Sequence, residues 1–489
     1  MAPQRLKIRA VVDRARARNW QRRAVDELRA KGHDVRIAVN PDGCYLPAVI
    51  AALLTLERTI YGRANLEFGG FWKDPVANEP PGFAPDLELD FTCFVRDAGP
   101  VRTLRPIYAG SVMEEAGYME LLNGVSPVLG ILDSAPRLNV ETYHVAIEDP
   151  FKIGQAMDYI GARLGAFMCR AVAAIAAGEA RAVLETPSPS AFLGWSNRQA
   201  LSALSARAAA TIERLTTRAP RWHVGWRRTT CGGIAESLAI PAGGWNRLPD
   251  DNRRYYADPF PVHRDGRDWV FVEEYPYATR KGLLSAVEIG PEGPLGAPKP
   301  VLELAHHLSY PFVFEDGGEI WMIPESCAAR RVELYRAKQF PWSWELSRVL
   351  IADEEVSDAT VVRHGGRYWL FGTVGGGWQS SWDTLKIWSA ERLTGPWTPC
   401  GDGPALVDSR CARPAGRFFT RGGELWRPAQ DCSTGYGAGL ALARVDRLDT
   451  DGFAPTTGAI LRPNSAWPGI GIHTVNMSNG LEVVDGCTA

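Results

Sequence analysis

Hydrophobic and polar positions follow different patterns in the two halves of the chain. In the first half, short apolar runs at Leu6–Asp13 and Asp34–Asn40 flank the segment Arg18–Lys31, where apolar residues recur at helical spacing until Gly32. A strand, a helix and a second strand at this spacing predict a βαβ unit and a parallel sheet. We therefore expect an α/β, Rossmann-like domain over residues 1–185.

A different composition separates this half from the next. Pro187 and Pro189 stand among serines, and the Ala-rich segment Gln199–Thr217 follows them. Proline and serine clusters mark linkers, whereas alanine favours helix. Residues 186–219 are therefore predicted to form a helical linker.

From about residue 220 a repeat replaces the helical pattern. A turn ending in glycine precedes a Trp-bearing strand in HRDGRDWVFVEEY, EDGGEIWMIPES, RHGGRYWLFGT and TRGGELWRPAQD. The tryptophans, Trp269, Trp321, Trp369 and Trp426, lie about 50 residues apart, and NMSNGLEVVDGC forms a fifth, weaker copy. Repeats of this length with several short strands predict an all-β, five-bladed propeller over 220–489, with the tryptophans in the blade cores.

A second regularity places polar residues at one mouth of the propeller channel. The strand before each glycine turn opens with AlaAspPro, SerTyrPro, SerAspAla, AlaArgPro or IleHisThr. Because equivalent positions of different blades form one ring, the predicted ring holds Asp258, Tyr310, Asp358, Arg413 and His473. The next strand returns to the same mouth and is expected to bring Glu274, Glu325, Gln430 and Asp431.

Acidic residues that converge on a concave site suit glycosyl transfer. One carboxylate acts as base or nucleophile, and a second, protonated one acts as acid on the departing oxygen. Arg413 is suited to an anionic substrate group or to holding one aspartate ionised. Each residue also has a simpler interpretation: Arg413 and Arg427 as ion-pair partners of the acids, and His473 as a hydrogen-bond partner across the channel.

The segments YYADPFPV, SYPFVF with IPES, and SDATVV resemble the five-bladed propellers of glycoside hydrolase families 43 and 32. This resemblance implies that Asp258 is the base or nucleophile, that Asp358 is a pKa modulator or stabiliser, and that Glu325 is the acid. Glu325 lies in the second blade, whereas these families place their acid later in the chain.

The segments PFVFEDGGEIWMIPES, FPWSWEL, ARPAGR and RPAQDC are more similar to the propeller region named as the N-terminal domain of plant glucosamine inositolphosphorylceramide transferases. In bacteria this region follows a formyltransferase-like domain, and the first half of the chain resembles that fold in outline. His33 and His144 stand in no formyltransferase motif, so we expect neither formyl transfer nor folate binding.

Composition limits the functional class and the cellular location that the sequence allows. The 54 Lys+Arg residues against 56 Asp+Glu, a net charge of −2, argue against a nucleic-acid binder. Nine cysteines without a CxxC pair, and a start without a secretion signal, favour a reducing cytoplasmic location. Five arginines between positions 14 and 23 predict a solvated helix face, with attraction to anionic lipid, and hence peripheral membrane contact, as the alternative.

The sequence therefore predicts an enzyme that transfers a glycosyl unit from an activated sugar donor to a surface glycan or glycolipid acceptor. The alternatives are a glycoside hydrolase of the family 43/32 type and a non-catalytic propeller that binds a glycan or protein. No cofactor is predicted, and an ion in the channel is left open. The catalytic residues are expected to be Asp258, Asp358 and Glu325, and the substrate-binding residues Tyr310, Arg413, Arg427, Gln430, Asp431, His473 and Glu274.

Overall fold

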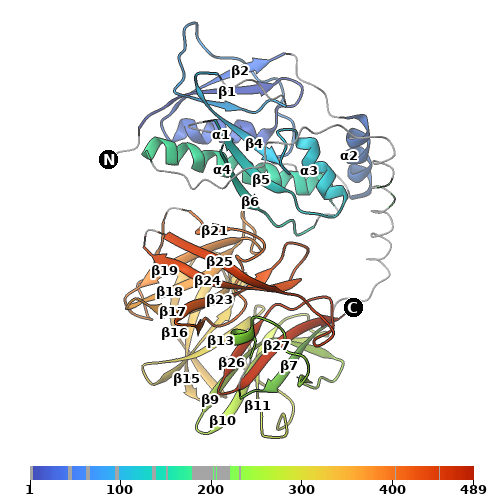
Figure 1. Cartoon of the computed structure of the whole chain (residues 1–489), viewed down its shortest axis with the longest axis vertical. Coiled ribbons are helices and arrows are strands. Elements are labelled where there is room, and N and C mark those ends of the chain that lie inside the picture. The colour runs from blue at the N-terminus through green and yellow to red at the C-terminus, as the bar shows by residue number, and fades with distance from the viewer. Residues whose placement is uncertain are drawn as a thin grey trace. The chain divides into compact units, whose positions relative to one another are not determined.

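The computed structural model describes residues 4–41, 47–61, 67–93, 99–134, 139–149, 152–178, 202, 205, 221–230, 233–401, 403–450 and 452–488. The chain divides into two compact units, Met1–Thr216 and Thr217–Ala489. Apart from residues 202 and 205, the predicted helical linker lies outside the described residues. Each unit is described by itself (Figure 1).

The first unit contains a six-stranded sheet in the order β2-β1-β3-β4-β5-β6. Its strands are β1 (Lys7–Asp13), β2 (Asp34–Asn40), β3 (Leu87–Asp90), β4 (Arg102–Tyr108), β5 (Val128–Asp133) and β6 (Asn139–His144). Strands β2, β1, β3 and β4 are parallel, as the βαβ pattern predicts, whereas β5 and β6 are antiparallel additions. The formyltransferase likeness of this unit stays a prediction.

Among the described residues of the first unit, the helices are α1 (Asn19–Ala30), α2 (Ala48–Tyr61), α3 (Glu114–Leu122) and α4 (Ile153–Ala177). Helix α4 is long and apolar enough to cross a membrane, with a mean hydropathy of 1.5 over its most apolar 18 residues, but 67% of that window is buried inside the protein. A Cβ atom on Gly161 would lie only 2.7 Å from the Trp20 ring, so the glycine lets α1 approach α4 closely. Helix α4 is therefore a buried core helix of this unit.

The second unit contains five sheets that follow one another along the chain (Figure 1). The first four are formed by β9 (Arg254–Arg264) to β12 (Lys299–Leu302), β13 (Ser309–Asp316) to β16 (Ser343–Ala352), β17 (Val356–His364) to β21 (Leu406–Val407), and β22 (Phe419–Arg421) to β25 (Gly452–Leu461). The strands within them are β10 (Arg267–Pro276), β11 (Leu283–Glu288), β14 (Glu319–Glu325), β15 (Arg331–Gln339), β18 (Arg367–Val374), β19 (Thr384–Ala390), β20 (Thr398–Pro399), β23 (Glu424–Asp431) and β24 (Gly439–Asp449). The predicted five-bladed propeller is confirmed.

The fifth blade joins strands from both ends of this unit. Strands β26 (Val475–Ser478) and β27 (Leu481–Thr488) pair with β7 (Arg221–Arg228) and β8 (Asn246–Arg247). Strand β27 is antiparallel to β7 from Leu481 opposite Arg228 to Thr488 opposite Arg221. The backbone hydrogen bonds of this one pairing therefore close the ring.

The repeated sequence features have a direct structural role. The turn glycine between the first two strands of each blade has a positive φ, from 72° to 84°, which glycine adopts without a steric penalty (Gly266, Gly318, Gly366, Gly423 and Gly480). Trp269, Trp369 and Trp426 are buried in blade cores, as predicted, and Trp321 is partly buried against the core cluster that contains Phe312 and Met322.

Candidate active site in the propeller channel

The first strands of the first three blades are irregular at the residue predicted to face the channel. The pairing register of β9, β13 and β17 shifts at Asp258, Tyr310 and Asp358, respectively. These residues have φ values of 49°, 42° and 54°, in the left-handed region that costs a non-glycine residue about 1–3 kcal/mol. A bulge re-aims a side chain, and such strain persists only where the surrounding structure fixes it. The same local distortion therefore presents three polar side chains in three blades.

Tyr310 links its own blade to three others through its buried polar groups. Its backbone N–H donates to Asp258 Oδ2 at 3.1 Å, and its hydroxyl lies 2.9 Å from Thr360 Oγ1. The same hydroxyl accepts the N–H of Gly416 at 2.7 Å. Tyr310 is fully buried, so the structure places this predicted substrate-binding residue within the channel wall.

Asp358 lies at the centre of a buried group that combines blades two, three and four. Its backbone N–H donates to Glu325 Oε2 at 3.2 Å, and its Oδ2 lies 2.7 Å from Arg413 Nε. Gln430 Nε2 donates to the same oxygen at 2.9 Å, and Arg413 Nη2 lies 3.6 Å from Glu325 Oε2. Burial raises the pKa of Asp358 well above its ordinary value, against the opposing charge of Arg413.

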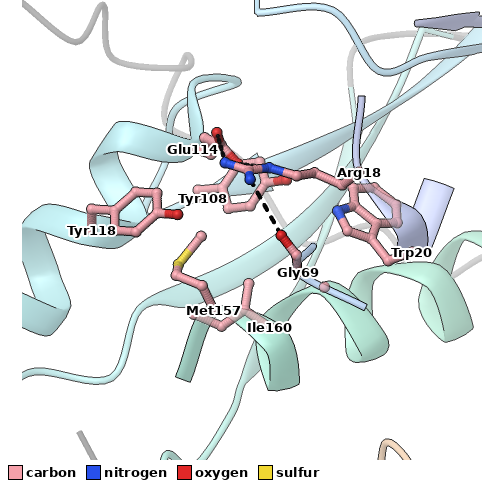
Figure 2. Close-up of a pocket in the computed structure, with 9 residues that line it drawn as sticks. Arg18, Trp20, Gly69, Tyr108, Glu114, Tyr118, Met157 and Ile160 are labelled. Carbon is pink, nitrogen blue, oxygen red and sulfur yellow. Dashed lines mark hydrogen bonds and ion pairs between the residues drawn. The ribbon is translucent and has the colours of Figure 1, made fainter. Parts of the chain in front are cut away.

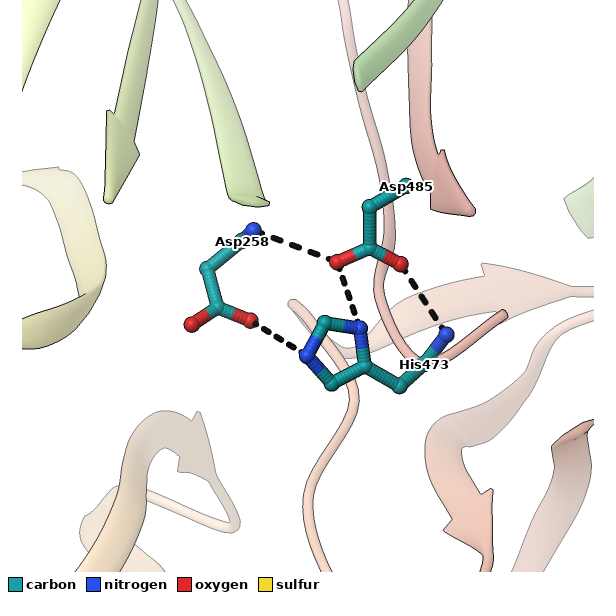
Figure 3. Close-up of side chains that lie close together, drawn as sticks. All are labelled: Asp258, His473 and Asp485. Carbon is teal, nitrogen blue, oxygen red and sulfur yellow. Dashed lines mark hydrogen bonds and ion pairs between the residues drawn. The ribbon is translucent and has the colours of Figure 1, made fainter. Parts of the chain in front are cut away.

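Asp258 belongs to a second buried group, formed with blade five (Figure 3). Its Oδ1 accepts the Thr474 hydroxyl at 2.9 Å and lies 3.4 Å from His473 Nε2. The other ring nitrogen, Nδ1, lies 2.6 Å from Asp485 Oδ2. Burial raises the pKa of Asp258, and His473 opposes that rise. Burial also disfavours the charged form of His473, but Asp485 and Asp258 outweigh it, so the net effect raises the pKa of His473.

Asp258, His473 and Asp485 are residues of the kind that bind metal ions, and they lie close together. One potential ligand atom of each lies within 4.8 Å of the others. However, the two carboxylates face opposite nitrogens of the imidazole, as Figure 3 shows. This arrangement is a chain of close charge contacts between acid, imidazole and acid rather than three ligands that converge on one point.

Glu273 faces this acidic group, whereas the predicted residue, Glu274, does not. Glu274 accepts the Ser285 hydroxyl at 2.6 Å and pairs with Arg254. Glu273 is buried, with His307 Nε2 at 3.5 Å from its carboxylate. Burial, followed by the negative charges of Asp258 and Glu325, raises the pKa of Glu273 well above its ordinary value.

The repeat contained the signal for Glu273. Glu325 and Gln430 each follow the blade tryptophan by four residues, and Glu273, not Glu274, has the same spacing from Trp269. Asp485 was missed for another reason. The fifth copy of the repeat lacks the tryptophan, so it provides no register for the residues of β27.

Two other predicted residues, Asp431 and Arg427, have their partners outside the buried clusters around Asp258 and Asp358. Asp431 Oδ2 lies 2.5 Å from Arg462 Nη2, and its Oδ1 accepts the N–H of Ser433. Arg427 donates to the carbonyl oxygens of Cys411, at 2.8 Å, and Ala412. In the described part of the chain, Arg427 therefore supports the backbone just before Arg413 rather than pairing with the acids.

The first unit contains its own buried ionic group (Figure 2). Arg18 Nη2 lies 2.6 Å from Glu114 Oε1, as Figure 2 shows. Arg16 Nη2 lies 2.7 Å from Glu115 Oε1. Arg16 and Arg18 are buried, so the predicted solvated arginine face is wrong for these two residues. Arg18, Glu114, Tyr108 and Tyr118 line a small pocket in this unit.

Comparison with known proteins gives similarity over the propeller. The profile described as glucosamine inositolphosphorylceramide transferase 1, N-terminal, matches residues 250–481. The enzyme of that name from Arabidopsis thaliana is 32% identical over 246 residues, which cover 47% of this chain and 32% of the relative. The enzyme of that name from Oryza sativa subsp. japonica is 32% identical over 235 residues, which cover 45% of this chain and 31% of the relative. The match thus spans about a third of the curated relatives.

Solved structures with a similar fold include glycoside hydrolases. The exo-β-1,3-galactanase from Phanerochaete chrysosporium in complex with β-1,3-galactotriose is 14% identical, covers 45% of this chain and 55% of its own, and has a TM-score of 0.36. RS223-β-xylosidase is 13% identical, and the match covers 44% of this chain and 79% of the xylosidase chain, with a TM-score of 0.35.

Proposed function

We propose that this protein transfers a glycosyl unit from an activated sugar donor to a glycan or glycolipid acceptor, and that the reaction takes place in the propeller channel. The observation that carries the proposal is the pair of buried groups around Asp258 and Asp358, in which two carboxylates have different partners. The similarity to relatives named as a transferase, 32% identical over this region, favours transfer over hydrolysis.

The contacts suggest a division of roles. Asp258 acts as the base, or as the nucleophile, since its partner His473 is titratable. Asp358, held in place by Arg413, modulates the pKa of Asp258, because each of the two buried carboxylates disfavours ionisation of the other. Glu325 is the acid predicted from the sequence, but its Oε2 is engaged by the Asp358 N–H and lies near Arg413. Glu273, whose pKa is raised well above its ordinary value by burial, is the better proton donor.

The relatives' name suggests the acceptor class for the experiment. The full chain is incubated with nucleotide-activated hexoses and hexosamines and with an inositol-phosphate-bearing lipid, and products are followed by mass spectrometry. Transfer to the lipid supports the proposal. Release of free sugar, also from aryl glycofuranosides, indicates the hydrolase alternative, and binding without turnover indicates a binding propeller.

A matched pair of variants ties the activity to the channel. Asp258→Asn is expected to lower kcat/KM by at least about 10³-fold, as loss of a catalytic carboxylate does. Asp265→Asn is the control because Asp265 is an exposed turn residue with a similar backbone, φ 52°. Equal activity of the two variants would contradict the proposed site.

We also propose a cytoplasmic location, with contact to the membrane only through the acceptor. Cysteines 93, 169, 327, 400, 411, 432 and 487 are free thiols in the described part of the chain, and a reducing compartment keeps thiols in this state. Fractionation of cells that express the full chain tests this location.

A further inference from the structure

The two central aspartates have cations of different chemical character. Asp358 pairs with Arg413, whose guanidinium stays charged at every accessible pH. Asp258 faces His473, whose imidazole gains and loses a proton near neutral pH. The negative charge of Asp358 thus has a permanent partner, whereas that of Asp258 has a switchable one.

Asp485 fixes the orientation of the imidazole. Its carboxylate accepts the backbone N–H groups of His473 at 3.0 Å, Thr474 at 2.9 Å and Asp258 at 3.1 Å, and its Oδ2 lies 2.6 Å from His473 Nδ1. A carboxylate that receives three backbone donors is held in one position, and because its oxygens carry only lone pairs, it favours the proton on the nearby Nδ1. Nε2 is therefore the nitrogen that faces Asp258 (Figure 3).

The surroundings of His473 exclude water and contain both signs of charge. The ring lies 4.0 Å from the ring of Trp222 and 5.5 Å from that of Tyr436, measured between centroids, and 3% of the residue is exposed. Asp485 and Asp258 favour its charged form, whereas burial and the charge of Arg413 oppose it. Around Asp258, the charges of Asp485 and Glu325 add to burial in disfavouring ionisation.

We propose that His473 is a positioning residue for Asp258: as an imidazolium oriented by Asp485, it keeps the Asp258 carboxylate ionised and ready to accept a proton. When His473 loses its charge, Asp258 is left in a buried acidic group without a cation and binds a proton itself. Asp258, and not Asp358, is then the carboxylate whose protonation changes during the reaction. The catalytic part of this inference rests on the proposed function.

The lone pairs of the Asp258 carboxylate determine which of its oxygens can accept the proton of the acceptor hydroxyl. Asp258 Oδ2 accepts the Tyr310 N–H and retains a second lone pair, whereas Oδ1 faces Thr474 and His473. The acceptor hydroxyl gives its proton to Oδ2, and its oxygen keeps the electron pair of the broken O–H bond. That pair forms the new bond to the anomeric carbon, while the leaving group departs with the electrons of the old bond.

The test measures protonation directly and needs no substrate. The imidazole of His473 is titrated by ¹⁵N NMR in the full chain, with His473→Gln identifying its signal. We expect a midpoint above the ordinary value of about 6.5, and a fall of at least about one unit in Asp485→Asn. Asp268→Asn is the control, because Asp268 pairs with the half-exposed His263 at 2.7 Å and lies outside the buried clusters around Asp258 and Asp358.

Several outcomes would overturn the inference. These are a wild-type midpoint at or below about 6.5, a midpoint unchanged in Asp485→Asn, and a titration altered by EDTA, which would show a bound ion. Circular dichroism checks that each variant folds. If Asp485→Asn does not fold, the inference is tested by the titration midpoint of His473 in the wild type and in the Asp258→Asn variant.

An activity measurement separates this inference from the proposed function. In His473→Gln, kcat for transfer should fall about 10²-fold with little change in KM, and the acidic limb of the pH profile should move to higher pH. The expected titration without any transfer activity would contradict the proposed function alone. Transfer activity with an unshifted acidic limb would contradict the role of His473 alone.

Discussion

Glu273 and Glu274 are neighbours in β10, yet their carboxylates lie in opposite environments. Successive side chains of a strand point to opposite faces of the sheet. Glu274 is bound by Ser285 and Arg254, whereas Glu273 faces the acidic group around Asp258 and has His307 Nε2 at 3.5 Å from its carboxylate. Two acids of identical chemistry should therefore affect stability with opposite signs.

Glu273→Gln should stabilise the protein above the pH at which an unfolded glutamate ionises. The pKa of Glu273 is raised in the folded state by burial, so the folded state binds more protons and loses stability as the pH rises. Each pKa unit corresponds to about 1.4 kcal/mol, or about 2–4 °C in Tm for a domain of this size. Thermal unfolding at pH 4 and pH 8 should show the gain mainly at pH 8.

Glu274→Gln is the matched comparison at the next position. It weakens a buried hydrogen bond from Ser285 and removes the charge that faces Arg254, so we expect a loss of about 1–3 kcal/mol. If both variants lowered Tm at pH 8, Glu273 would not be the uncompensated carboxylate.

Asp258→Asn and Asp358→Asn should act non-additively on activity. If both carboxylates serve one reaction, either change removes most of the rate, and the double variant loses little more. The rates of the two single variants and the double variant, measured for transfer, give the coupling. Independent losses that multiply would indicate two separate functions for the two groups.

Arg413→Gln should destabilise the propeller strongly. It leaves Asp358 and Glu325 buried without their cation, and breaking a buried pair in this way costs about 3–5 kcal/mol. Chemical denaturation should show a much smaller loss for Arg421→Gln, because Arg421 is exposed. Adding Asp358→Asn to Arg413→Gln should recover part of the loss, since it removes one of the unpaired charges.

Tyr310→Phe tests whether Tyr310 has a structural role. The change removes the acceptor of the buried Gly416 N–H and the partner of Thr360, which costs about 1–3 kcal/mol. Tyr368→Phe provides the control: its hydroxyl bonds Asp316 on a partly exposed side chain, where water replaces the lost partner. A similar loss of unfolding free energy in both variants would contradict the buried link.

The propeller could be predicted because its turns require residues that are visible in the sequence. The glycine at each hairpin and the tryptophan three residues later recur in four copies, and a fixed offset of eleven residues locates Asp258, Tyr310 and Asp358. Arg413 has an offset of thirteen, and the structure shows why: β22 begins only at Phe419, so Arg413 precedes the short first strand of its blade.

Other features depend on contacts between distant residues and could not be predicted in this way. The partner of Arg18 is Glu114, on a helix almost a hundred residues further along, so nothing in the local pattern distinguishes Arg18 from its exposed neighbours. Similarly, the sequence places His473 in the ring but gives no sign that Asp485 orients it, because that contact depends on the turn between β26 and β27.

The way the fifth blade closes has a consequence during synthesis. Asp485 lies on β27, and β27 is held by β7, which the ribosome produces more than two hundred residues earlier. While translation is still in progress, the nascent propeller has an open edge at β7, and neither the anchor of His473 nor the partner of the Asp258 N–H is present. The growing chain therefore remains without the contacts that join Asp258, His473 and Asp485 until β27 has left the ribosome.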